Sequence, residues 1–420
     1  MKISYAQAEI TPTNGEDLCG YTLRSPGSTA VLDPLYVRWI HLTDHRGEVA
    51  LLGSADLIGT SRNWHDGLTQ NISQQTGLPA RHIGLATTHT HSGPVTVRLR
   101  HCGRFNQPYM RQLHSTMQHS AVEACQAPQT PVRVLLGQSV SDEGINRRHD
   151  SGEPVDPQVL TLSFVHAKTG KPLATLVNFA CHPVTLSHCS NSVSADYCGY
   201  LVDEVSRHTN GAPCLFLNGA AGDINPRRRV ELSTNPDDPR DIGQSIARSA
   251  LDAIRDATEI SDPILTWHHQ TVRLPIHQRS PAELDDRLRM IEERFGIDPN
   301  LFADRVERDK QLMKNNRFPR TITIRLSLLT IGQQVGILFV PGELFTSLGQ
   351  RFKSILAPRK TIISGFSNGS VGYLPDRQAY ADGGYEPHFA NFFYDFPELL
   401  PDVDDVLIEG VQQLARKANG

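Results

Sequence analysis

Short apolar runs alternate with amphipathic periods along most of the chain. Runs such as 83–87 and 335–340 are rich in branched aliphatic residues and stop at polar residues or glycine, which predicts buried strands. Apolar residues that recur every three to four positions, as in 107–127, predict helices. The predicted strands are 37–42, 49–56, 83–87, 132–136, 160–165, 174–180, 214–217, 265–274, 321–331, 335–340 and 361–365, and the predicted helices are 61–76, 107–127, 197–208, 241–258, 281–295, 301–315, 343–356 and 402–417. This order is typical of an α/β fold with mixed, partly parallel sheets flanked by helices.

No linker rich in Pro, Gly or Ser divides the chain, so we expect one catalytic domain over residues 1–420. The segment 280–316 differs from its surroundings because it is dense in charge. Its two helical periods predict an exposed helical insertion, and such an insertion could serve as a lid over a site. A plain solvated face is the alternative interpretation of the same charges.

Composition excludes several classes of protein. The 41 Lys and Arg against 45 Asp and Glu give a net charge of −4, which argues against a nucleic-acid footprint or a basic membrane surface. No apolar stretch is long enough for membrane insertion, and the N-terminus has no signal-like run. The seven cysteines contain no CxxC pair, so we expect reduced thiols in a cytoplasmic protein. Eighteen histidines favour metal or acid–base chemistry without locating it.

Several predicted strands end in residues that carry chemistry, at the position where α/β sheets bind ligands. His89 and His91 follow one strand two residues apart, and this spacing in extended backbone points both rings to one face. His182 follows a second strand, and Glu343 follows a third and is predicted to open the helix 343–356. Two histidines and a carboxylate are the ligands of a catalytic zinc site with an open position.

The motifs at these strand ends resemble those of the neutral/alkaline (non-lysosomal) ceramidase family of zinc-dependent amidases. The resemblance rests on THTHSGP, FACHPV, SADYCGY, GDINP, PGE and SNGSVGYL, in this order along the chain. It implies a ceramidase-like catalytic domain, in a short bacterial-type member without the C-terminal immunoglobulin-like domain. It also implies one Zn²⁺ per chain, with His89, His182, Glu343 and Tyr373 as ligands.

The resemblance assigns further roles. His91 would lie beside the metal and hydrogen-bond the scissile carbonyl, and Tyr385 would stabilise the oxyanion. Arg147 matches a family Asn-Arg pair near the site. Asn225 stands where the family has a serine, and an amide is too weak a nucleophile for a covalent route, so we expect Asn225 to hydrogen-bond instead. The implied reaction is hydrolysis of a linear amide (N-acyl) bond by attack of zinc-bound water.

Arginines crowd the loops after the strand ends, at 98, 100, 104, 147, 148 and 227–229. They are interpreted either as solvated loops or as a rim that binds a carboxylate or phosphate. With the missing signal and the missing C-terminal domain, the rim favours a soluble, acidic small-molecule amide over ceramide. Assembly into a homo-oligomer is a further expectation.

Three other functions compete with amide hydrolysis. The same zinc chemistry would serve an ester or lactone hydrolase, and the metal site could also belong to a non-catalytic metal-binding protein. The third alternative is a serine hydrolase, because 365–369 fits GxSxG with Ser367 as nucleophile. That motif needs a helix directly after the turn, and the following SVGYLPDRQAY predicts none.

Overall fold

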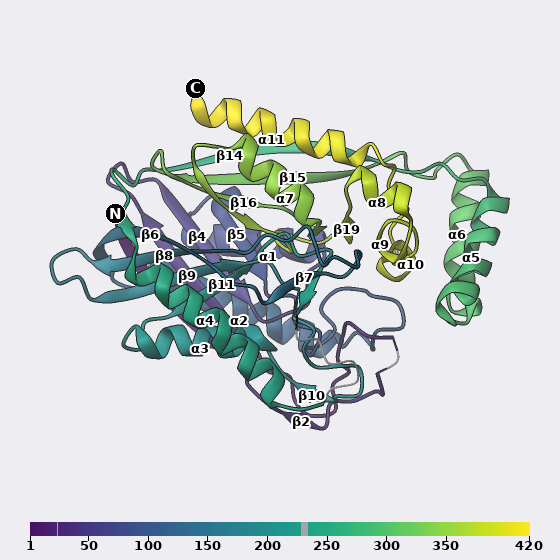
Figure 1. Cartoon of the computed structure of the whole chain (residues 1–420), viewed down its shortest axis with the longest axis horizontal. Helices are drawn as coiled ribbons and strands as arrows, with labels where there is room; N and C mark the ends of the chain where they lie inside the picture. Colours follow the sequence, from purple (N-terminus) through teal and green to yellow (C-terminus); the bar gives the residue numbers. More distant parts are fainter. Residues whose placement is uncertain (23, 228–233) are drawn as a thin grey trace.

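The computed structural model describes residues 1–22, 24–227 and 234–420. Its centre is formed by two β-sheets that pack face to face, with helices on the outer faces (Figure 1). Apolar side chains from both sheets, among them Ile40, Leu162 and Ile337, share one buried cluster. The facing surfaces of the sheets therefore exclude water from the largest part of the core.

The larger sheet has the order β11-β9-β8-β6-β1-β3-β4-β5, and β13 pairs with β6. The pairs β4/β5 and β9/β11 are parallel. Helices α1 to α4 cover its outer face through two apolar clusters. The elements are β1 (Lys2–Glu9), β3 (Tyr36–Thr43), β4 (Val49–Ala55), β5 (Ile83–Thr87), β6 (Thr130–Val140), β8 (Gln158–His166), β9 (Pro172–Phe179), β11 (Cys214–Asn218), β13 (Thr258–Glu259), α1 (Arg62–Thr76), α2 (Gln107–Gln126), α3 (Tyr197–His208) and α4 (Asp237–Arg255).

The smaller sheet has the order β14-β15-β16-β18, with β16 and β18 parallel. Its outer face is covered by α7 and α11, whose apolar residues join those of the sheet in a second buried cluster. The elements are β14 (Leu265–Pro275), β15 (Thr321–Ile331), β16 (Val335–Phe339), β18 (Lys360–Ser364), α7 (Thr346–Ile355) and α11 (Val403–Asn419).

A helical hairpin of α5 (Pro281–Phe295) and α6 (Ala303–Lys314) connects β14 to β15. It stands beyond the sheets at one end of the molecule, beside the short helices α9 (Tyr385–His388) and α10 (Ala390–Tyr394) (Figure 1). An apolar cluster that includes Phe302 and Phe389 joins the hairpin to these helices. The charged segment 280–316 is therefore helical, as predicted, and it is docked along one apolar face.

The base of the hairpin is fixed by a buried carboxylate. Glu398, 8% exposed, accepts hydrogen bonds from Arg279 at 2.7 Å, from Arg287 at 2.9 Å and from the ring of His388 at 2.9 Å. Burial alone would raise the pKa of Glu398, but these partners lower it to about 2.

The predicted α/β architecture with partly parallel sheets is confirmed. Strand β1 was not predicted, and it joins the two halves of the larger sheet by pairing with β3 and β6. The prediction that Glu343 opens a helix was wrong. Glu343 lies in the two-residue strand β17 (Glu343–Leu344), which pairs in parallel with β19 (Tyr373–Leu374), and helix α7 begins at Thr346. No helix in the described part of the chain is long and apolar enough to cross a membrane.

Candidate metal centre

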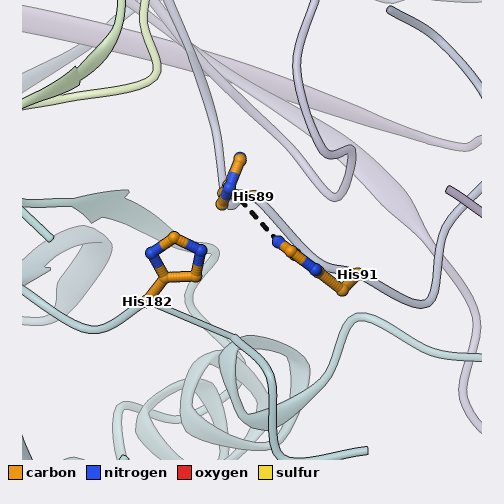
Figure 2. A group of neighbouring side chains, drawn as sticks. All are labelled: His89, His91 and His182. Atoms are coloured by element: carbon orange, nitrogen blue, oxygen red, sulfur yellow. Dashed lines mark hydrogen bonds between the residues drawn. The ribbon is translucent and has the colours of Figure 1, made fainter. Parts of the chain in front are cut away.

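Three histidines converge at the ends of two strands of the larger sheet. His89 and His91 follow β5, and His182 follows β9. One ring nitrogen from each histidine lies within 4.8 Å of the corresponding nitrogens of the other two histidines. Figure 2 shows the three rings turned toward a common point. The Nε2 atoms of His89 and His91 are 3.3 Å apart. His89 has a φ of 72°, a strained conformation for a residue with a side chain that persists where the surroundings enforce it.

Asn218, at the end of β11, holds the two histidine segments together. Its side-chain amide donates to the carbonyl of Thr88 at 3.0 Å and to the carbonyl of Cys181 at 2.9 Å, and its oxygen accepts from the Cys181 N–H at 3.2 Å. Thr88 and Cys181 directly precede His89 and His182. Sequence reasoning missed Asn218, although a polar residue that ends the apolar run CLFL was a signal that could have found it.

The orientation of two rings is set by backbone carbonyls. Nδ1 of His89 lies 2.6 Å from the carbonyl oxygen of Ile58, and Nδ1 of His182 lies 2.9 Å from that of Ala221. If Nδ1 donates the proton, Nε2 keeps a free lone pair, which is the usual arrangement for a metal-ligating histidine. Burial and then the neighbouring His89 lower the pKa of His182 well below its usual range, so this ring is neutral at pH 7.

Glu343 faces the histidines from β17, the short strand that follows β16 of the smaller sheet. It is fully buried, and neither carboxylate oxygen has a hydrogen-bond partner among the described residues. Oε2 lies 3.4 Å from Nε2 of His89 and 3.9 Å from Nε2 of His182. Because a buried carboxylate without a partner is costly, this arrangement fits residues that share a cation.

Tyr373 is placed beside Glu343 by the β17/β19 pairing, in which the two residues are direct partners. Burial first, and then Glu343, raise the pKa of the Tyr373 hydroxyl well above its usual range. The ring of Tyr385 lies 6.1 Å from that of Tyr373, centroid to centroid. The two predicted tyrosines are therefore neighbours.

Arg147 connects Tyr373 to Asn225, another predicted residue, and to Glu386, which was not predicted. Its guanidinium donates to the Tyr373 hydroxyl at 3.5 Å, to Oδ1 of Asn225 at 3.3 Å and to Glu386 at 3.0 Å. Burial opposes its charge, but Tyr373 and Glu386 raise the pKa of Arg147 above its usual range. Pairing of β12 (Ile224–Pro226) with β7 (Gly144–Asn146) brings Asn225 next to this arginine.

A cavity of about 230 Å³ opens beside the histidines. His91, Tyr373 and Tyr385 line it together with residues from five further segments, most of them apolar or aromatic. Ile297, from the connection after α5, is one of these, so the helical hairpin contributes to the wall. The further lining residues are Gly20, Tyr21, Thr22, Ile58, Leu99, Cys102, Phe393 and Tyr394.

Two other predicted features are Ser367 and the arginine rim, and both are bonded mainly within the protein. Ser367 is fully buried, and its hydroxyl is bonded to Ser364 Oγ at 2.6 Å and to the Gly365 carbonyl at 2.8 Å, with no helix directly after it. The predicted arginine rim is largely engaged within the protein: Arg100, Arg104 and Arg148 pair with carboxylates. Arg227 donates to backbone carbonyls, and Arg228 and Arg229 lie outside the described residues.

The buried histidine group and the unpartnered Glu343 fit a metal ion. Imidazole nitrogens with one carboxylate suit zinc and several other divalent transition metals. The resemblance places His91 beside the metal and outside the ligand set, whereas the geometry groups its ring with those of His89 and His182. Which residues complete the ligand set therefore stays a prediction.

Neither the protein-family models nor the curated proteins contain a match to this sequence. Solved structures do match. The neutral ceramidase from Pseudomonas aeruginosa superimposes with a TM-score of 0.78 over 99% of this chain and 74% of that chain, at 18% sequence identity. A ceramidase complexed with C2 gives the same TM-score and coverage at 17% identity. The chain thus has the ceramidase-like fold that its motifs predicted, with a buried three-histidine group able to hold a metal ion.

Proposed function

We propose that this protein is a zinc-dependent hydrolase that cleaves the amide bond of a small N-acyl substrate. The observation that carries the proposal is the convergence of His89, His91, His182 and Glu343 beside a cavity that His91 and Tyr385 line. When bound, zinc would polarise the substrate carbonyl and lower the pKa of a water molecule at the site. His89, His182 and Glu343 would hold the ion, with Tyr373 as the fourth ligand that the motifs imply.

The remaining side chains would orient the substrate and stabilise the charge that develops on it. The Tyr385 hydroxyl stays protonated at neutral pH, because burial raises its pKa well above its usual range, so it can donate to an oxyanion. His91 lines the same cavity and is positioned to hydrogen-bond the carbonyl. Arg147 would act as a positioning residue, since it fixes the Tyr373 hydroxyl and Asn225.

The cavity favours a substrate whose acyl group is uncharged and apolar. Its lining is aliphatic and aromatic, with Ile58, Leu99 and Phe393 among the contributors. An acidic substrate gains less support, because Arg100, Arg104 and Arg148 already pair with carboxylates. We propose a soluble substrate, processed in the cytoplasm, and assembly with further copies of the chain remains part of the proposal.

The test combines metal analysis with hydrolysis of a panel of N-acyl amines of increasing chain length. We expect bound zinc, hydrolysis that a chelator abolishes and zinc restores, and loss of both metal and activity in His182→Ala. Tyr385→Phe should keep the metal and lower kcat about 100-fold. Ser367→Ala is the matched control and should leave kcat unchanged.

Other outcomes would assign a different function. Hydrolysis of esters or lactones but not amides would favour the ester or lactone hydrolase, because the oxyanion chemistry is shared. Zinc binding without hydrolysis of any substrate would favour the non-catalytic metal-binding protein. Chelator-resistant activity that Ser367→Ala abolishes would favour the serine hydrolase and refute the proposal.

A further inference from the structure

A second cavity, of about 160 Å³, lies between α1, β15 and the loop 368–371. It shares no lining residue with the cavity at the metal centre. The short 3₁₀ helix Ala80–His82 closes one side. None of the residues that line it belongs to the metal centre, so its chemistry has to be explained separately.

The charged groups around this cavity are mainly positive. Arg62, Arg81 and Arg325 line it from three different elements, against the single carboxylate of Asp66. Arg62 donates to the carbonyl of Thr323 and lies 3.6 Å from Asp66, so its guanidinium is held at the cavity. Three guanidinium groups against one carboxylate leave an excess of positive charge, which would attract an anion.

Neighbouring titratable groups respond to the same charges. The hydrogen bond from His65 and then the charges of Arg62 and Arg325 lower the pKa of the Asp66 carboxyl. Burial first, and then Arg325 and Arg81 among nearby cations, lower the pKa of His269 to about 4. Both directions agree with a positive potential over this part of the surface.

His65 adds a buried polar group that lacks a partner. The residue is 7% exposed, and its Nδ1 lies 3.3 Å from Oδ1 of Asp66. Nε2 is buried and has no hydrogen-bond partner among the described residues. Because an unsatisfied buried nitrogen costs free energy, an oxyanion that accepts a hydrogen bond from Nε2 would be stabilised, with the ring protonated on both nitrogens. Ser327, Asn368 and Ser370 offer further polar groups on the walls.

We propose that this second cavity is a binding site for a small oxyanion, the phosphate or carboxylate group of a metabolite, held by Arg62, Arg81, Arg325 and His65. Guanidinium groups bind both kinds of oxyanion in a bidentate manner, which suits a site built from several arginines. The site is distinct from the hydrolytic centre, and its existence does not depend on the reaction proposed there.

The position of this anion site connects it to the metal centre. Its wall at Asn368–Val371 belongs to the segment that starts at Phe366 and ends at Tyr373. The Phe366 ring stacks on His89 with centroids 4.1 Å apart, and Asn368 is fixed to Leu85 by two hydrogen bonds. A bound anion would therefore contact the segment that carries a proposed metal ligand.

The experiment is calorimetric titration of the purified protein with inorganic phosphate at constant ionic strength in chloride, and in parallel with acetate. We expect one saturable site for at least one of these anions, with a dissociation constant of about 1 mM or tighter. In Arg81→Ala/Arg325→Ala the affinity should fall about tenfold or more. Both arginines are exposed, so the double variant is expected to fold normally.

The control is Arg46→Ala/Arg317→Ala, which removes two exposed arginines that do not line the cavity and should leave the affinity unchanged. Tighter binding of phosphate would identify a phosphorylated ligand, and tighter binding of acetate would identify a carboxylate. Failure of both anions to saturate the wild-type protein would overturn the proposal. Equal binding by the wild type and the Arg81/Arg325 variant would overturn it too, because the anion would then bind elsewhere.

Discussion

The substitution Glu343→Gln tests whether the Glu343 carboxylate binds a metal ion or only stabilises the fold. It preserves the size of a fully buried side chain and removes its charge. Both carboxylate oxygens lack a hydrogen-bond partner among the described residues, and the closest ring nitrogens are 3.4 and 3.9 Å away. Desolvating the charge costs several kcal/mol, whereas an unpartnered amide costs about 1–3 kcal/mol. We therefore expect the metal-free variant to be more stable than the wild type by about 2 kcal/mol.

The same substitution should have the opposite effect on metal binding. An amide oxygen is a weaker ligand for zinc than a carboxylate, and it supplies no charge to neutralise the ion. We expect the affinity of Glu343→Gln for zinc to fall about 100-fold or more. If Glu343 is a metal ligand, Glu343→Gln should therefore make the metal-free protein more stable and bind zinc more weakly.

The assay is urea unfolding of the metal-free proteins, followed by competitive titration with zinc. Glu398→Gln is the matched control, because Glu398 is also buried but is bonded to Arg279, Arg287 and His388. Removing one partner of a buried ion pair should destabilise that variant by about 3 kcal/mol and leave zinc binding unchanged. If Glu343→Gln destabilises the metal-free protein as much as the control does, our account of an uncompensated carboxylate is wrong.

Three further predictions concern stability and specificity. The pKa of Glu398 is about 2 in the folded protein against a usual 4.5, so its stabilisation is present above about pH 4.5 and is lost as the pH falls toward 2. The unfolding midpoints of the wild type and Glu398→Gln should therefore converge over this pH range. A constant difference between the two midpoints would contradict the lowered pKa. Asn218→Ala leaves the backbone groups of Thr88 and Cys181 beside His89 and His182 without these hydrogen-bond partners. Urea unfolding should show a free energy of unfolding about 3 kcal/mol lower, and zinc titration should show weaker binding. Unchanged values would show that Asn218 does not hold the histidine segments in place. Ile297→Ala enlarges the substrate cavity, so kcat/KM should shift toward longer acyl chains, and an unchanged preference would show that the hairpin does not shape it.

The histidine positions could be predicted because they depend on short-range patterns. His89 and His182 directly follow apolar runs of strand length, and the ends of such strands are where α/β sheets collect their chemistry. Glu343 was reached in the same way, from its position after an apolar run, and the resemblance to ceramidases then added Tyr373. Both lie in segments that follow strands of the smaller sheet. The structure brings these residues together through the β17/β19 pair, and two-residue strands of this kind carry no periodic signal.

Other features depend on contacts between distant parts of the chain. Asn218 lies 130 residues from Thr88, so nothing local indicates that its amide joins two histidine segments. The partners of Arg100 and Arg148 lie more than 200 residues away, and without them the sequence leaves two interpretations of these arginines, solvated loops or a substrate-binding rim. Strand β1 was missed because half of its eight residues are lysine, alanine or glutamate, which are depleted in strands. Pairing on both sides stabilises it instead.

The proposed ligands come from both layers of the sandwich. His89 and His182 extend from strands of the larger sheet, and Glu343 and Tyr373 from segments that follow strands of the smaller sheet. An ion bound by all four would act as a cross-link between the sheets, closing a loop of 161 residues between His182 and Glu343. Because the four ligands are brought together only in the folded chain, the binding free energy of the ion adds to the stability of the fold. The protein would then depend on its metal for the cohesion of its two layers as well as for chemistry, so that metal supply would limit its lifetime along with its activity.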